Sequence, residues 1–200
     1  MAKSVTMFTP TGVAHFPSLY KFSEYNGAST GKYEVTLILE DTDEVWAFAE
    51  DLETKALDKA KEQGVTRVVK MKNPKFPIRK GDDINADREE KGNDPKEEFA
   101  GKWVLKARTS MAFPIMIPKS LPVTTKVDGG DLIKLKIGVK PFDTGSSAGF
   151  SAYLNGVKLI EKRASSWGDD DDDDYYDASS ESDQAPANPG TSSDADHDDY

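Results

Sequence analysis

A run of basic residues in the middle of the chain carries the clearest chemistry. Phe76 lies among these cations, and Pro74 and Pro77 exclude a regular central strand, which leaves an exposed loop or edge. Single-stranded nucleic acid binding needs cations that follow phosphates and exposed rings on which bases stack. A solvated basic loop is an equally weighted alternative for this segment alone. The run contains no acidic residue, and its cations are Arg67, Lys70, Lys72, Lys75, Arg79 and Lys80.

Two further segments place cations on one face of a predicted strand. Apolar and polar residues alternate in 102–109 and in 132–140, so one face of each strand belongs to the core and the other is basic. If the three segments converge, their charges form one groove. Phe142, Tyr153 and Phe113 are the further stacking candidates. The two basic faces consist of Lys102, Lys106 and Arg108, and of Lys134, Lys136 and Lys140.

Acidic residues offer a rival chemistry, because nucleases hold divalent metals with paired carboxylates. The candidates are Asp82, Asp83, Asp87, Asp128 and Asp131, of which a nuclease would use Asp82, Asp83 and Asp131. Asp82 and Asp83, however, precede a charged run that is typical of a solvated loop. The chain has no cysteine and only two histidines, His15 and His197, which argues against thiolate and histidine-based catalysis. No nucleotide-binding glycine motif is present, so we expect neither a cofactor nor a metal.

The elements that must position these residues are mostly strands. Residues 32–39 alternate with a period of two, and a strand through 149–162 has apolar residues on both faces. One amphipathic helix is predicted over about 43–62, with Trp46 and Phe48 expected in the core. Trp103 is also expected to be buried. One helix among some five strands indicates a mainly β fold, a small barrel with one prominent helix.

The charge of the chain is divided unevenly along its length. The formal net charge is −10, yet 13 of the 36 acidic residues lie between residues 164 and 200, where there is no Lys or Arg. Residues 1–163 therefore hold 26 basic and 23 acidic residues, a balance of +3. The last 37 residues lack Leu, Ile, Val, Phe and Met, which predicts a disordered acidic tail after a domain of residues 1–163.

These patterns resemble the OB-fold single-stranded DNA-binding proteins of lytic tailed phages. The likeness rests on the segment 76–83, on 98–107, on the strand pair within 130–157, and on an acidic tail that ends in the aromatic Tyr200. The tail departs from the family pattern in its Asp and Ser content and in ending with Tyr where Phe is familiar. The residues before Lys32 match no part of the family pattern.

The resemblance implies an OB-fold-like five-stranded barrel that coats single-stranded DNA without sequence preference and without catalysis. It implies a role in phage DNA replication, recombination and repair at replication forks in the cytoplasm of the bacterial host. It also implies a homodimer, and a tail that competes with DNA and recruits the phage DNA polymerase and helicase–primase. A metal-dependent nuclease and an acidic-tailed DNA mimic or chaperone are the alternatives. The partner-binding residues of the tail would be Asp169, Asp170, Asp171, Asp172, Asp173, Asp174, Asp198, Asp199 and Tyr200.

Overall fold

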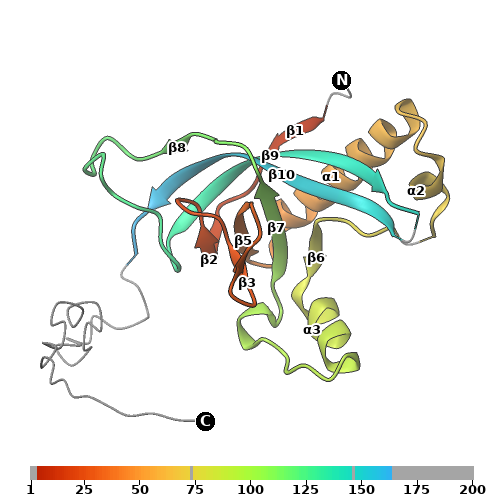
Figure 1. The fold of residues 1–200 in the computed structure, drawn as a ribbon, viewed down its shortest axis with the longest axis horizontal. Helices are drawn as coiled ribbons and strands as arrows, with labels where there is room; N and C mark the ends of the chain where they lie inside the picture. Colours follow the sequence, from red (N-terminus) through yellow and green to blue (C-terminus); the bar gives the residue numbers. More distant parts are fainter. Residues whose placement is uncertain (1–3, 73, 146, 164–200) are drawn as a thin grey trace, which may run out of the picture. The chain divides into compact units, whose positions relative to one another are not determined.

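The computed structural model describes residues 4–72, 74–145 and 147–163 (Figure 1). The chain divides into two units, Met1–Trp167 and Gly168–Tyr200, and every described residue lies in the first. The predicted tail lies outside the described residues, so its disorder and partner contacts stay predictions. The described strands are β1 (Val5–Phe8), β2 (Gly12–Ser18), β3 (Glu24–Tyr25), β4 (Ala28–Ser29), β5 (Tyr33–Leu39), β6 (Ile78–Lys80), β7 (Trp103–Thr109), β8 (Ile115–Met116), β9 (Leu132–Asp143) and β10 (Ala148–Glu161).

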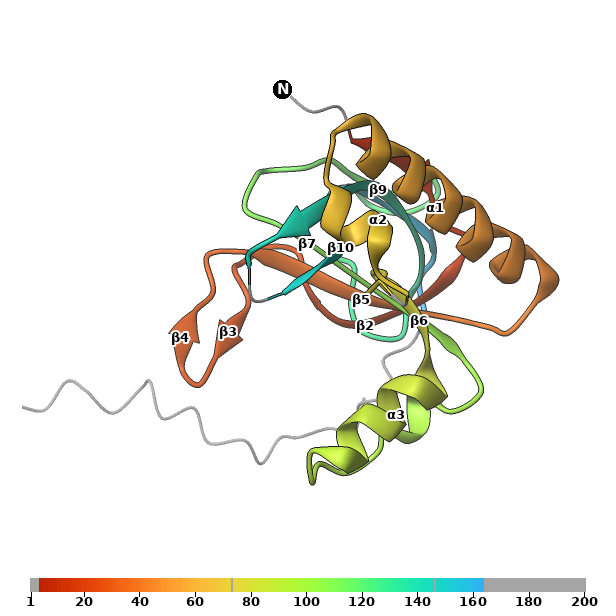
Figure 2. The same cartoon turned by 90° about the vertical axis from the view of Figure 1, so that its right-hand side faces the viewer.

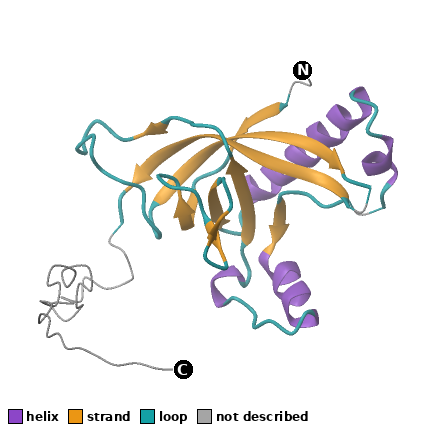
Figure 3. Ribbon diagram, in the orientation of Figure 1, coloured by secondary structure: helices purple, strands orange, loops and turns teal. Residues whose placement is uncertain are grey.

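Five of these strands close into a ring. Each strand is hydrogen-bonded to the next in the order β2, β5, β7, β10 and β9, and β9 returns to β2. The pairs are antiparallel except for β7 and β10, which run parallel. Figure 3 shows the strands at the centre, with helices to the right of them and below them. The mainly β, OB-like fold expected from the sequence is confirmed, with β1, β6 and β8 added to the edges of the ring.

The inward faces of the ring strands form one hydrophobic core. In β5, β7 and β9 the alternate residues that the period of two predicted for the core, from Val35 to Leu39, from Trp103 to Ala107 and from Ile133 to Val139, are buried in one cluster. On the opposite face Ile38 and Val104 are also buried, in a second small cluster with Phe99. In β10 the two parities both contain buried residues because the pairing with β9 shifts register between Leu154 and Gly156. A β-bulge there moves the inward side chains from even to odd positions, which explains why the sequence did not assign its faces.

The predicted helix is confirmed as α1 (Asp43–Glu62), and its buried stripe packs into the same core. Thr42 caps its first turn by accepting a hydrogen bond from the Val45 backbone N–H. Phe48 is buried as expected, but Trp46 is 44% exposed, so its predicted core position is wrong. The Trp46 ring packs edge-to-face against Trp103 and lies under the Lys80 ammonium at 4.1 Å. These two contacts hold the Trp46 ring at the edge of the buried face of α1.

Three shorter helical elements were not expected. They are α2 (Thr66–Lys70), α3 (Gly81–Glu90) and the 3₁₀ turn η1 (Glu97–Phe99). Figure 2 shows α2 beside α1, while α3 lies at the opposite end of the ring. The solvated loop predicted for the charged run that follows Asp83 is therefore wrong as far as Glu90, where α3 ends. Ile84 of α3 packs against the small cluster that contains Phe99, and the Asn85 amide exchanges two hydrogen bonds of 2.9 Å with the Lys96 backbone. No described helix is long and apolar enough to cross a membrane.

Gly81 offers a direct test of this packing. A Cβ at this position would lie 1.8 Å from the Phe99 carbonyl oxygen, a backbone atom that cannot rotate away. We expect Gly81→Ala to lower the free energy of unfolding by about 2 kcal/mol or more, because α3 and η1 must separate. Gly129→Ala is the control, since its nearest neighbour would be the Pro17 side chain at 4.0 Å. Equal urea midpoints for the two variants would contradict the packing.

Candidate nucleic-acid interface

An exposed surface on the outside of the ring brings two of the predicted basic segments together. Arg108 of β7 is the direct neighbour of Tyr153 of β10, and both side chains are exposed. Tyr153 is 43% exposed, and the Lys140 ammonium of β9 lies 5.2 Å from its ring centre. Glu34 of β5 lies opposite Arg108 on the side away from β10, and its carboxylate pairs with Lys106 of β7 at 2.7 Å. Cations from β7 and β9 thus border one exposed aromatic ring.

The surface continues along β9 toward β1. Lys136 is the Cα partner of Phe8, whose ring is 61% exposed and lies 5.8 Å from the Lys136 ammonium. Lys134 lies opposite Lys158 of β10, a cation that the sequence did not single out. Among the described residues, no carboxylate lies within 4 Å of the charged nitrogens of the unpaired cations here. We call the set Lys106, Arg108, Lys134, Lys136, Lys140 and Tyr153 the outer basic face.

The first part of the basic run reaches one end of this face. Arg67 bonds Asp143 at 3.0 Å and the Gly145 carbonyl, both at the end of the β9–β10 hairpin. The backbone of Lys75 lies against Gly149, the partner of the half-buried Phe142. A side chain at position 149 would collide with the Lys75 carbonyl at 2.8 Å, so this close approach requires glycine.

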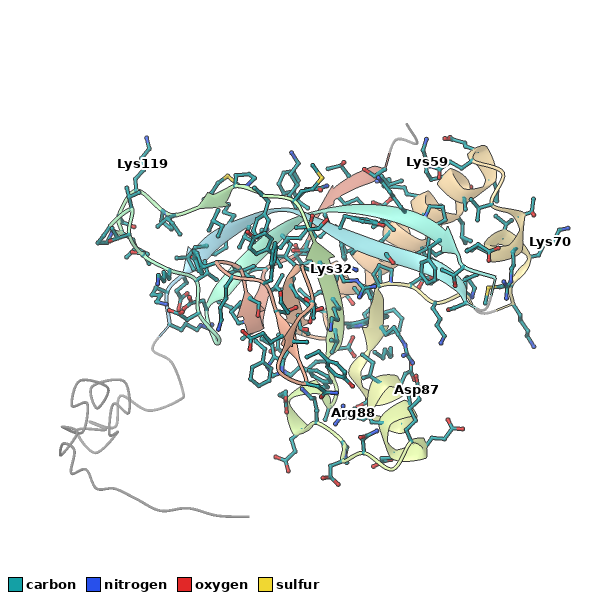
Figure 4. The ribbon with its side chains drawn as sticks, viewed as in Figure 1. Lys32, Lys59, Lys70, Asp87, Arg88 and Lys119 are labelled. Atoms are coloured by element: carbon teal, nitrogen blue, oxygen red, sulfur yellow. The ribbon has the colours of Figure 1, made fainter. Side chains whose placement is uncertain are left out.

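Phe76 is half-buried at the surface. Its ring stacks on Phe150 with centres 4.9 Å apart and planes 4° apart, and it packs against the core. One ring face is therefore already covered. Lys70 ends α2 and points outward there (Figure 4), and Lys72 is exposed in the following loop.

The remaining predicted cations lie away from the outer basic face. Arg79 pairs with Asp87 of α3 at 2.8 Å, and this hydrogen bond and charge hold the pKa of Asp87 below its usual value. Asp87 and Arg88 mark α3 in Figure 4. Lys80 covers the Trp46 ring, and Lys102 pairs with Glu40. The structure therefore joins parts of the three basic segments on the outer basic face, while Arg79 and Lys80 line a pocket of about 530 Å³ together with Lys75 and Phe76.

The acidic candidates have separate structural positions. Asp131 is fully buried and accepts hydrogen bonds from the backbone N–H groups of Asp128 at 2.7 Å and Arg163 at 2.9 Å. Lys162 also contacts Asp131. Burial alone would lower the pKa of Lys162, but the hydrogen bonds that its ammonium donates to Asp128 and Asp131 raise this pKa above its usual value. Asp82 instead accepts from the Gly101 N–H at 3.0 Å. In the described part of the chain, no three His, Asp or Glu side chains are arranged to hold a metal ion.

Sequence reasoning missed an open cavity of about 720 Å³ beside β2. His15 and Phe16 of β2, Glu98 of η1 and the turn at Gly129 and Gly130 line it. Phe16 is 65% exposed and has a φ of 45°. This φ is rare for a bulky residue. The β2–β5 pairing slips between His15 and Ser18, and the Phe16–Pro17 step was the available signal, because proline cannot donate within a sheet.

The register connects this cavity to the outer basic face. His15 is the Cα partner of Thr36 on β5, and Thr36 is the partner of Lys106 on β7. Neighbouring strands are about 4.8 Å apart, so the cavity lies about two strand spacings from Lys106. The cavity and the cations therefore belong to one surface across β2, β5 and β7.

His15 supplies a prediction that depends on its burial. Burial and the charge of Lys96 lower the pKa of His15, with Glu98 opposing them. Below about pH 6.5 the unfolded chain binds a proton that folded His15 resists, so this residue reduces stability as the pH falls. In a His197→Gln variant, which leaves one imidazole signal, NMR titration should give a midpoint below 6.5. A higher midpoint would mean that Glu98 dominates.

Comparison with known proteins identifies related structures. The structure of the single-stranded DNA-binding protein from bacteriophage Enc34 in complex with ssDNA aligns with a TM-score of 0.63 and 18% identity, covering 80% of this chain and 88% of that chain. The gp2.5 single-stranded DNA-binding protein of bacteriophage T7 aligns with a TM-score of 0.55 and 14% identity, covering 88% and 96%. At these identities the likeness shows the fold. Comparison with curated proteins gives no significant match.

Membership of a family rests on the sequence itself. The model of the ssDNA-binding protein family of Enterobacter phage Enc34 matches residues 9–185, which include the ring, the helices and part of the acidic segment. This match confirms the phage resemblance drawn from the local motifs. The chain belongs to the Enc34 ssDNA-binding protein family.

Proposed function

We propose that this protein binds single-stranded DNA on the outer basic face, without sequence preference and without catalysis. The observation that carries the proposal is the row of Arg108, Tyr153 and Lys140, which puts two cations beside one exposed ring on adjacent strands. Family membership supports the same ligand. The cations neutralise phosphates, and the ring stacks on a base, which contributes about 1–3 kcal/mol.

Further residues extend the binding surface in both directions. Lys134 and Lys136 lengthen the row of cations along β9, and Phe142 and Lys75 lie at the hairpin end. Lys106 contributes once its contact with Glu34 is exchanged for a phosphate. Cations that follow the phosphates and rings that stack on bases make no specific hydrogen bonds to the base edges. Binding therefore tolerates any sequence.

The acidic tail regulates this surface in our proposal. Asp131 holds the backbone of Arg163, the last described residue, so the tail begins from a fixed point of the domain. A tethered acidic segment reaches an effective concentration near the millimolar range, enough to compete with DNA phosphates. DNA displaces the tail, which then recruits the phage DNA polymerase and helicase–primase through its carboxylates and Tyr200. The protein acts in replication, recombination and repair at the forks of the infected cell's cytoplasm, as a homodimer.

The proposal is tested by the salt dependence of binding. With about four to six phosphates contacted, the slope of log affinity for an oligo(dT) against log salt should be about −3 to −4. An affinity that does not change with salt would contradict the proposal, and a domain without affinity would favour the DNA-mimic or chaperone alternative. Incubation of labelled single and double strands with Mg²⁺ tests the nuclease alternative, which alone yields shorter products. The structure uses Asp131 to hold Arg163, which counts against that alternative.

A further inference from the structure

The β3–β4 hairpin carries an exposed aromatic residue at its tip. Tyr25 pairs with Ala28, and only Asn26 and Gly27 connect the two strands. Both connecting residues have positive φ, 51° and 76°, as in the type I′ turn that matches the twist of a hairpin. Tyr25 is 73% exposed, and Figure 2 shows the hairpin extending from the ring on the side away from α1. This ordered turn holds a large ring out in solvent, where the ring adds nothing to the hydrophobic core.

Contacts at the base of the hairpin hold it in a fixed position. The Ser23 N–H donates to the Lys32 carbonyl at 2.8 Å, and the Thr30 N–H donates to the Ser23 carbonyl at 2.8 Å. The hydroxyls of Ser23 and Thr30 lie 2.6 Å apart. The Phe22 ring packs on Tyr33 with centres 4.8 Å apart. The tip is therefore positioned before any ligand arrives, which reduces the conformational cost of binding there.

The strand register places the hairpin at one end of the outer basic face. Tyr33, the first residue of β5, is the Cα partner of Thr109 on β7. The next pair along these strands is Glu34 and Arg108, and Arg108 begins the row that continues to Tyr153. The tip lies five residues before the start of β5, which is at most about 18 Å of chain. A nucleic acid that leaves the outer basic face across β5 therefore reaches the hairpin.

The tip offers a ring but no charge. Residues 25–31 contain no Lys, Arg, Asp or Glu, and no described cation lies over the Tyr25 ring. Tyr153 differs, because the Lys140 ammonium lies 5.2 Å from its ring centre. A ring beside a cation suits a single nucleotide, whose base stacks while its phosphate is neutralised. A ring without a cation suits a flat apolar surface whose phosphates lie farther away, and the last base pair of a duplex presents such a surface.

We infer that the β3–β4 hairpin binds the junction between single-stranded and double-stranded DNA, with Tyr25 stacked on the last base pair while the outer basic face holds the adjoining single strand. Proteins that insert apolar side chains between base steps make the same exchange of base stacking for side-chain stacking. The inference rests on the proposed function, because the outer basic face must hold the single strand. It adds a second ligand, the end of a duplex, for which the outer basic face has no surface of its own.

The test compares two kinds of DNA by fluorescence anisotropy with the full chain. One is an oligo(dT), and the other is a stem-loop that carries the same oligo(dT) as a single-stranded extension, at its 3′ end in one version and at its 5′ end in another. Tyr25→Ala should weaken binding to at least one stem-loop about 5-fold or more, and binding to oligo(dT) by less than about 2-fold. Because tyrosine is uncharged, the extra phosphates of the stem-loop contribute equally in the native chain and in the variant. The side chain is exposed, so the domain should stay folded.

Two further variants identify the cause of the loss. Tyr25→Phe keeps the ring and should retain the native affinity for all three DNA molecules. Val123→Ala is the matched control, since it shortens an almost fully exposed apolar side chain in the loop before β9, and it should change no affinity. Equal losses for oligo(dT) and both stem-loops in Tyr25→Ala, or no loss at all, would overturn the inference. A native chain that does not bind oligo(dT) would instead contradict the proposed function, and the inference with it.

Discussion

Replacing Arg108, Lys136 and Lys140 together with alanine is expected to weaken single-stranded DNA binding about 100-fold at low salt. Arg108 lies on β7 and the two lysines lie on β9, the strands on either side of β10, and none of the three has a carboxylate within 4 Å among the described residues. Their charge is therefore free for phosphates. Each lost phosphate contact removes about 0.7 from the slope of log affinity against log salt, so the slope should fall by about 2. Fluorescence anisotropy across a salt series measures both quantities.

A matched variant separates position from total charge. Replacement of Lys59, Lys61 and Lys119 removes the same charge from α1 and from the loop after β8 (Figure 4). Lys59 and Lys61 hold only exposed ion pairs with neighbours on or beside the helix, which contribute little to stability. This control should keep most of the affinity and the slope. An equal loss in both variants would mean that overall charge, and not the outer basic face, determines binding.

The strands and their faces could be predicted from the sequence because alternation is a local property. In β9 every second residue from Ile133 to Val139 is buried, and the lysines between them are not. The same holds for β7, where Trp103 donates its indole N–H to Asp41 at 2.9 Å and is otherwise buried. Burial on one side of a sheet leaves a period of two in the chain, and no knowledge of partners is needed to find it.

Which cations belong to the outer basic face depended on ion pairs with distant segments, and the sequence does not reveal these pairs. Arg79 and Lys140 are both cations near an aromatic residue in the chain, but Asp87 of α3 pairs with Arg79 and no described carboxylate reaches Lys140. The helix that supplies Asp87 contains one apolar anchor, Ile84, and its pattern indicated a loop. Long-range contacts therefore decided which cations stayed available.

The cavity beside β2 escaped prediction for a different reason. His15 is a half-buried strand residue, and its neighbours Glu98 and Gly129 in the cavity come from distant segments. The exposure of Phe16 follows from a backbone irregularity that alternation cannot detect. Sites built from a strand defect and two remote turns leave no periodic trace in the chain.

Ending the chain at Arg163 is expected to tighten single-stranded DNA binding about 10- to 100-fold at low salt. The removed segment carries 13 carboxylates and no cation, and it is tethered to a domain whose balance is +3. The tethered tail has an effective concentration near the millimolar range at the basic face, and DNA must displace it before it binds. Salt weakens both the contact of the tail with the domain and the contact of DNA with the domain. The gain should therefore shrink as salt rises. The Asp131 contacts with Lys162 and Arg163 remain in the shortened chain, so the domain should keep its stability.

Two further chains determine whether charge or length produces the gain. Replacing the six residues from Asp169 to Asp174 with asparagine keeps the length of the tail and removes nearly half of its charge. It should reproduce part of the gain, because competition with phosphates depends on the carboxylates. Deleting Tyr200 alone should leave DNA affinity unchanged but weaken polymerase binding, since one aromatic residue adds little to the competition for phosphates. If the chain ending at Arg163 bound DNA no better than the full chain at low salt, the tail would act on partners alone and the outer basic face would be free at all times.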